Sequence, residues 1–242
     1  MDFESTVPGM TNAQTRRTVL RGIALGGLSA AVGACASGTS TAQEHLTTPT
    51  TPDGALQRLL EGNKRLLANQ TLHPQTLDDI RKHATGQAPY AQVFGCADSR
   101  VPVEAVFDED FGDVFVTRTA GNVLSDPTIG TIEYGVLALQ TPLIMVLGHQ
   151  NCGAVKAAVD ALKDPAKLPT GPLGALVSAL LPAARQAKEH SGDIYAAALE
   201  AHVRSVVTTL QGTPSLAGPI AAGTLRVVGA SYDLSTGKVS LY

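Results

Sequence analysis

The sequence predicts an α/β protein with a mostly parallel central sheet, helices on both faces, an antiparallel edge strand and an N-terminal helical arm. Beyond residue 52, short apolar segments alternate with helical patterns, the arrangement typical of parallel strand–helix–strand units. The segment Leu143–Leu147 is apolar throughout, as expected for a parallel strand that is covered on both faces. These two observations define the fold class.

The expected strands are short and rich in β-branched residues. Four are predicted for the parallel part of the sheet: Ala91–Gly95, Val114–Val116, Leu143–Leu147 and Leu225–Gly229. The turn residues Ser235–Gly237 precede a fifth, Lys238–Tyr242, which we expect to close the chain as the edge strand.

Helical patterns lie between and before these strands. Thr51 and Pro52 are a favourable helix start, and the leucines of the segment Leu56–Leu67 follow at near-helical spacing. This first helix is expected either to embrace a partner subunit or to pack on its own core. Further helices are predicted at Pro127–Gln140, Cys152–Leu162 and Asp193–Gln211.

Composition excludes several functions. The chain has 242 residues, of which 44% are hydrophobic and 16% charged, so the body is globular rather than disordered. The net charge is -3 and no lysine- or arginine-rich run follows residue 21, which argues against a nucleic-acid partner. Three cysteines do not make a disulfide scaffold, and the lack of tryptophan disfavours an aromatic sugar platform.

Residues 1–36 have the features of an export signal. Arg16 and Arg17 precede the apolar segment 22–36, which is shorter than the roughly 20 residues of a membrane span. The arginine pair with a modest apolar segment resembles a twin-arginine signal, so we expect an extracytoplasmic protein.

The residues around Cys35 resemble a lipoprotein box, which would make Cys35 a lipidated N-terminus and the only link to a membrane. An ordinary cleavage site between small residues also fits, and this alternative stays open. Residues 37–52 are rich in Ser, Thr, Gly and Pro and are predicted to be a disordered tether. The folded domain is then expected to span residues 53–242.

Metal-binding residues follow two of the predicted strands. Cys96 comes directly after Ala91–Gly95, and His149 and Cys152 follow Leu143–Leu147. If these strands are neighbours, the three side chains converge, because the carboxyl ends of parallel strands meet at one edge of the sheet. Two thiolates and one imidazole leave one position open on a tetrahedral zinc ion, which is typical of a catalytic site.

Cys152 is expected to stand at the start of a helix, where the helix dipole lowers the pKa of a thiol. The remaining histidines have no such neighbours in the sequence and are expected to be solvated or incidental: His45, His73, His83, His190 and His202.

The motif Cys96-x-Asp98-x-Arg100, followed 53 residues after the cysteine by His149-x-x-Cys152, resembles the β-class carbonic anhydrases. A second segment, with Arg118 followed by Gly121 and Asn122, resembles the Arg-x-x-Gly-Asn segment of that family. The resemblance spans most of residues 53–242.

The resemblance implies one zinc ion per chain, bound by Cys96, His149 and Cys152. It also implies a dyad of Asp98 and Arg100 that orients zinc-bound hydroxide for attack on carbon dioxide, giving bicarbonate and a proton in a reversible reaction. In a closed state of some family members the residue equivalent to Asp98 is itself the fourth zinc ligand.

The resemblance further implies that Gly121 and Asn122 line the substrate cleft, and that the protein is a homodimer or tetramer. Two other functions stay open: a related hydrolase of carbon disulfide or carbonyl sulfide, and a non-catalytic zinc-binding lipoprotein. A redox role for Cys96 and Cys152 is disfavoured, because the chain has no Cys-x-x-Cys motif and His149 would be unexplained.

Overall fold

The computed structural model describes residues 48–73, 76–189 and 191–242. The predicted export signal, the lipidation site Cys35 and most of the predicted tether lie outside these residues, as do His45 and His190. Residues 48–50 have no regular secondary structure, and the first helix begins at Pro52, one residue before the expected start of the domain.

Five strands form the sheet: β1 (Ala91–Cys96), β2 (Val114–Thr119), β3 (Leu143–His149), β4 (Arg226–Tyr232) and β5 (Val239–Leu241). Eight α-helices in the described part of the chain surround it: α1 (Pro52–Leu67), α2 (Leu77–Lys82), α3 (Val103–Val106), α4 (Asp126–Leu137), α5 (Gly153–Lys163), α6 (Gly171–Ala187), α7 (Ile194–Gln211) and α8 (Pro214–Ala221). Two short 3-10 turns lie at Ala120–Asn122 and Pro165–Lys167.

The strand order is β2-β1-β3-β4-β5. The first four strands are parallel, and β5 pairs antiparallel with β4 at the edge. The predicted fold class and the neighbouring positions of β1 and β3 are therefore confirmed. The central strands β1 and β3 are buried at every position, as the apolar sequence of Leu143–Leu147 indicated.

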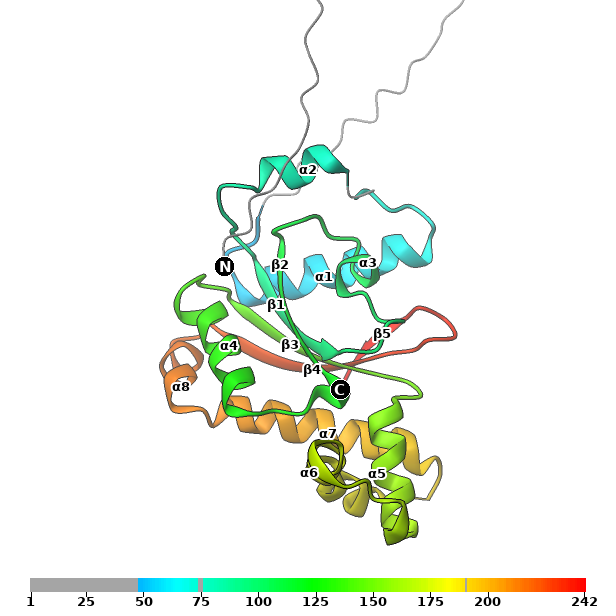
Figure 1. The fold of residues 1–242 in the computed structure, drawn as a ribbon. Coiled ribbons are helices and arrows are strands. Elements are labelled where there is room, and N and C mark those ends of the chain that lie inside the picture. The colour runs from blue at the N-terminus through cyan, green and yellow to red at the C-terminus, as the bar shows by residue number, and fades with distance from the viewer. Residues whose placement is uncertain (1–47, 74–75, 190) are drawn as a thin grey trace, which may run out of the picture. The chain divides into compact units, whose positions relative to one another are not determined.

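Helices cover both faces of the sheet (Figure 1). Alternate side chains of each strand point to opposite faces. On one face Phe94, Ile144 and Val146 pack with α4, α5, α6 and α7 in a buried apolar cluster. On the other face Val93 and Met145 join a second cluster with α1 and α3. This second cluster shows that α1 packs on its own core.

The start of α1 follows the expected chemistry. The Thr51 hydroxyl accepts a hydrogen bond from the Gly54 N–H at 3.2 Å, and Pro52 stands in the first turn, where its missing N–H is not needed. Leu56 and Leu59 are buried, whereas Leu67 is exposed at the end of the helix.

Asn63 joins α1 to two distant segments. Its amide nitrogen donates to the carbonyl oxygens of Val106 and Gly237, at 3.0 and 2.9 Å. Its amide oxygen accepts from the Val239 N–H at 2.9 Å. Because this side chain is buried, these bonds fix the first helix against the last strand.

Several elements were not predicted from the sequence, among them α6 and α8 and the extension of β2 to Thr119. Of the helices in the described ranges, none combines the length and the apolar character that crossing a membrane requires.

Two glycine substitutions test the packing of α1. A Cβ atom on Gly62 would lie 1.6 Å from the Phe107 carbonyl oxygen, which belongs to the backbone and cannot move aside cheaply. We expect Gly62→Ala to lower the free energy of unfolding by about 3 kcal/mol. Gly130 is a matched control in α4, where a Cβ atom would meet nothing within 4 Å.

We expect Gly130→Ala to raise stability by about 0.5–1 kcal/mol, because alanine restricts the unfolded chain. Urea unfolding followed by circular dichroism measures both variants. Equal stability of the Gly62→Ala variant and the parent would contradict the close approach of α1 to Phe107.

Candidate metal centre and its surroundings

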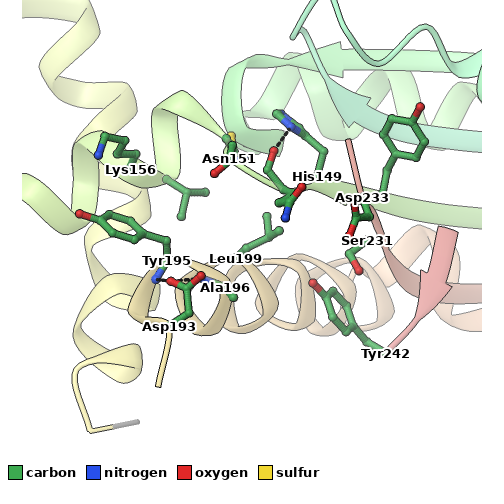
Figure 2. Close-up of a pocket in the computed structure, with 14 residues that line it drawn as sticks. His149, Asn151, Lys156, Asp193, Tyr195, Ala196, Leu199, Ser231, Asp233 and Tyr242 are labelled. Carbon is green, nitrogen blue, oxygen red and sulfur yellow. Dashed lines mark hydrogen bonds between the residues drawn. The ribbon is translucent and has the colours of Figure 1, made fainter. Parts of the chain in front are cut away.

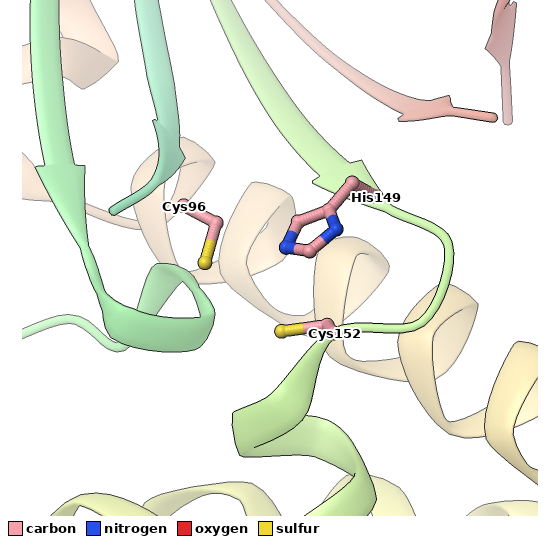
Figure 3. A group of neighbouring side chains, drawn as sticks. All are labelled: Cys96, His149 and Cys152. Carbon is pink, nitrogen blue, oxygen red and sulfur yellow. The ribbon is translucent and has the colours of Figure 1, made fainter. Parts of the chain in front are cut away.

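Three potential metal ligands meet at the carboxyl edge of the sheet. Cys96 ends β1, His149 ends the neighbouring strand β3, and Cys152 is the residue before the first turn of α5. Their ligand atoms all lie within 4.8 Å of one another, and the three residues are buried (Figure 3). The structure thus brings together the three side chains that the sequence predicted to converge.

The protonation of His149 suits a metal ligand. Its Nδ1 lies 2.9 Å from the Gln150 carbonyl oxygen, so Nδ1 carries the proton and donates it. The other ring nitrogen, Nε2, is buried and has no hydrogen-bond partner in the described structure. A buried lone pair without a partner is unfavourable, and a metal ion at this point would satisfy it.

The two thiols favour a cation between them. Hydrogen bonding with Cys152 lowers the pKa of Cys96, and the Gly121 N–H also donates to the Cys96 Sγ at 3.3 Å. The same interaction with Cys96, together with burial, raises the pKa of Cys152. The sequence predicted a lowered pKa for Cys152, and this prediction is wrong when no metal ion is bound to the two thiols. Backbone N–H groups of α5 do lower the pKa of Cys152. The neighbouring Cys96 and burial raise it more strongly, because they disfavour a second thiolate beside the first.

A divalent cation reverses this balance, because a coordinating thiol is deprotonated by the metal. Sulfur and imidazole ligands in a group of three suit zinc and leave one coordination position for a further ligand. The donor set thus fits a metal ion.

Asp98 and Arg100 form a bidentate ion pair beside these ligands. The Arg100 Nε donates to Asp98 Oδ1 at 2.9 Å, and Nη2 donates to Oδ2 at 2.7 Å. Hydrogen bonds from Arg100 hold the pKa of Asp98 well below its usual range. The Asp98 Oδ2 lies 3.7 Å from the His149 Nε2, so the carboxylate stands next to the ligand group while it remains paired with Arg100.

Arg118 has a role that the sequence did not reveal. Its guanidinium donates to the Cys96 carbonyl oxygen at 2.7 Å and to the Asp98 carbonyl oxygen at 2.6 Å. One side chain of β2 therefore fixes the backbone of the loop that carries both a ligand and the carboxylate. The motif containing Arg118 was recognised, but its hydrogen-bond partners depend on the pairing of β1 with β2.

Gly121 and Asn122 form a tight turn against the ligands. Both residues have a positive φ, of 64° and 54°, and a Cβ atom on Gly121 would lie 2.8 Å from the Ala154 Cβ. The buried Asn122 amide donates to the carbonyl oxygens of Phe94 and Leu147, at 2.8 and 3.1 Å. The amide nitrogen of Asn122 thus joins β1 and β3. A substrate contact of these two residues stays a prediction.

His202 is not solvated, and that expectation is wrong. It lies in α7 with 7% of its surface exposed, and its Nε2 is 3.3 Å from the Asn122 carbonyl oxygen. The sequence carried no local signal of this contact, because 80 residues separate the two partners. His83, in contrast, is exposed as expected.

A cavity of about 350 Å³ lies on the α7 side of the loop that carries His149 and Cys152 (Figure 2). Its wall includes Leu199, Tyr195 and the C-terminal residue Tyr242. Asp98 and Arg100 are not among the lining residues, but the Arg100 Nη2 donates to the carbonyl oxygen of the lining residue Asn151 at 3.4 Å.

Fold and site together define a class of protein: a parallel α/β protein with a buried Cys–His–Cys metal-binding group next to an Asp–Arg pair. Comparison with known proteins identifies the family. The carbonic anhydrase family model matches residues 91–239. A carbonic anhydrase of Mycolicibacterium smegmatis is 43% identical over 195 residues, which cover 78% of this chain and 93% of that protein.

Solved structures agree. The β-carbonic anhydrase of Coccomyxa in complex with acetazolamide has a TM-score of 0.61 and 31% identity, covering 77% of this chain and 85% of that chain. One of the two tetrameric β-carbonic anhydrases of Sordaria macrospora has a TM-score of 0.60 and 28% identity, covering 67% and 84%. The chain therefore belongs to the β-class carbonic anhydrase family.

Proposed function

We propose that this protein catalyses the reversible hydration of carbon dioxide to bicarbonate and a proton, with one zinc ion held by Cys96, His149 and Cys152. The convergence of these three side chains beside the Asp98–Arg100 pair carries the proposal. When bound, zinc supplies a nucleophile near neutral pH by lowering the pKa of water from 15.7 toward ~7.

The residues around the proposed metal position would orient the nucleophile toward carbon dioxide. Asp98 is ionised and faces the ligand group, so it can accept a hydrogen bond from the nucleophile and orient a lone pair toward carbon dioxide. Arg100 holds the carboxylate by two hydrogen bonds, which would keep Asp98 from binding the metal ion itself. Arg118 fixes the backbone at Cys96 and at Asp98 by donating to their carbonyl oxygens.

We propose Gly121 and Asn122 as the backbone wall of the substrate position. The Gly121 N–H donates to Cys96 Sγ, so the backbone of this turn lies next to the proposed metal position. Carbon dioxide is small and uncharged and needs space and orientation rather than a charged binding group.

A metal analysis with a hydration assay tests the function. We expect one zinc ion per chain by mass spectrometry of the metal, and stopped-flow hydration of carbon dioxide by the zinc-loaded protein. Asp98→Ala should retain zinc while losing about 100-fold or more in kcat, because the nucleophile is no longer oriented.

The parent is the reference for zinc content, and Glu104→Ala in α3 is the control for loss of a carboxylate elsewhere. Zinc binding without hydration of carbon dioxide would contradict the proposal. Hydrolysis of carbonyl sulfide or carbon disulfide by such a protein would favour the related hydrolase instead.

The activity should rise toward alkaline pH. Two thiolates neutralise the charge of the metal, so the nucleophile forms at higher pH than it would beside three neutral histidines. Arg100 holds the pKa of Asp98 below its usual range, so Asp98 stays ionised above its ordinary pKa and does not cause the rise. Stopped-flow rates should increase between about pH 6 and pH 9, and a flat profile would contradict the ligand set.

We propose that the chain forms a homodimer or a tetramer through the outer edge of β2. In the described structure β2 is the end strand of the sheet, and an edge with unpaired N–H and C=O groups normally requires cover. Phe115 packs against Tyr134 with ring centroids 6.0 Å apart, and Tyr134 and Leu137 are more than half exposed beside this edge. The tetrameric relatives of Sordaria macrospora support an assembly of this kind.

Light scattering after size-exclusion chromatography tests this edge. Tyr134→Lys should reduce the molar mass to that of a smaller species, because a charge in the centre of an apolar interface is unfavourable. Leu173→Lys is the matched control, since Leu173 is 59% exposed but lies in α6. If Tyr134→Lys left the molar mass unchanged, the interface would lie elsewhere.

We further propose that residues 1–36 direct export through the twin-arginine route and that Cys35 is lipidated, which would leave the catalytic domain on a tether outside the cytoplasm. The Arg16-Arg17 pair and the small residues around Cys35 support this. Mass spectrometry of the mature N-terminus should find diacylglyceryl-modified Cys35. A free N-terminus at Ser37 would favour ordinary cleavage.

A further inference from the structure

His202 is a buried ionisable residue that the proposed chemistry does not use. It lies in α7, whose neighbouring residues Leu199 and Val203 pack in the apolar cluster beneath the sheet. A buried imidazole needs a hydrogen-bond partner, and His202 finds it in the Asn122 carbonyl oxygen. Burial lowers the pKa of His202, so the ring is neutral at neutral pH.

The direction of this hydrogen bond follows from its partner. A carbonyl oxygen can only accept, so the proton of the neutral ring lies on Nε2 and is donated to Asn122. The acceptor belongs to the turn Ala120–Asn122, which carries the Gly121 N–H that donates to Cys96 Sγ. Two hydrogen bonds therefore connect His202 to a metal-ligating sulfur through one backbone turn.

Hydrogen bonds from other elements hold this turn. Asn122 has a φ of 54°, in the left-handed region, which asparagine adopts more readily than other residues with a side chain. The Asn122 amide holds the turn from the strands, through the carbonyl oxygens of Phe94 and Leu147. His202 holds it from the helix layer on one face of the sheet. The hydrogen bonds of the Asn122 amide and of His202 together fix the position of the Gly121 N–H.

We infer that His202 is a positioning residue of the metal centre, which fixes the Ala120–Asn122 turn through the Asn122 carbonyl so that Gly121 donates to the Cys96 sulfur. This inference rests on the proposed function, because it concerns the same ligand set. Partners of metal ligands orient the ligands and tune the metal, and their loss typically lowers metal affinity 10- to 100-fold.

The substitution His202→Phe tests this inference, since it keeps a flat ring but removes the donor. The zinc-loaded full chain should then lose about tenfold in zinc affinity, measured by competition with a chromophoric chelator. In the cobalt-substituted protein, the thiolate-to-cobalt charge-transfer band should shift, because the hydrogen bond to the Cys96 sulfur is weakened.

His202→Gln is the matched rescue, because the glutamine amide nitrogen occupies nearly the position of Nε2 and can donate to the same carbonyl. It should retain the parent's zinc affinity and absorption band. Val206→Ala is the control for packing, since Val206 is buried one turn further along α7 and belongs to the same apolar cluster. It should lower the unfolding temperature and leave the band unchanged. Should His202→Phe fail to fold, His202→Asn replaces it, because its shorter amide cannot reach Asn122.

Equal zinc affinity and an equal band in His202→Phe and the parent would overturn the inference, as would equal losses in His202→Gln and His202→Phe. Failure of the proposed function looks different. A parent that binds zinc but does not hydrate carbon dioxide contradicts the function and leaves the affinity and spectral comparison intact. A parent that binds no zinc overturns both.

Discussion

The parallel pairing of β1 with β3 is the constraint on which the metal centre depends. Cys96 and His149 are 53 residues apart in the chain, yet each ends one of these two neighbouring strands, so both emerge at the same edge of the sheet. Parallel strands need a crossover between them, and α4 and β2 lie in the intervening segment. Both strands are buried along their whole length, so a shift in register would disrupt the packing of their side chains in the core. The packed core therefore holds the two ligands in place.

Charge in the site is arranged in two layers. The inner layer contains two sulfurs and one imidazole, and both sulfurs become thiolates together only when a cation neutralises their charge. The outer layer consists of Asp98, Arg100 and Arg118, where ionised groups are paired or bonded to backbone carbonyls. The inner layer has the ligand atoms that could hold a metal ion, and the outer layer places one paired carboxylate beside them.

The sequence alone predicts much of this arrangement, and the failures have physical causes. The four parallel strands and the edge strand follow from local patterns of apolar and turn residues. The ligand group follows from two short motifs 53 residues apart, each placed directly after a predicted strand. The sequence does not predict α6, because small Ala and Gly residues dominate its buried face and give little hydrophobic periodicity, and because Pro182 inside it disfavours a helix. The roles of Arg118 and His202 were missed because their partners are 20 or more residues away, and only the packed structure brings them together.

The three hydrogen bonds of Asn63 have a consequence for how the domain opens. The same amide bridges the first helix, the segment at Val106 and the last strand, so α1 cannot detach without breaking its bond to the Val239 N–H. Fraying at the carboxyl terminus and detachment at the amino end of the domain are then coupled events. A protease that trims the final residues would thereby loosen the helix next to the segment that connects the domain to residues 1–47.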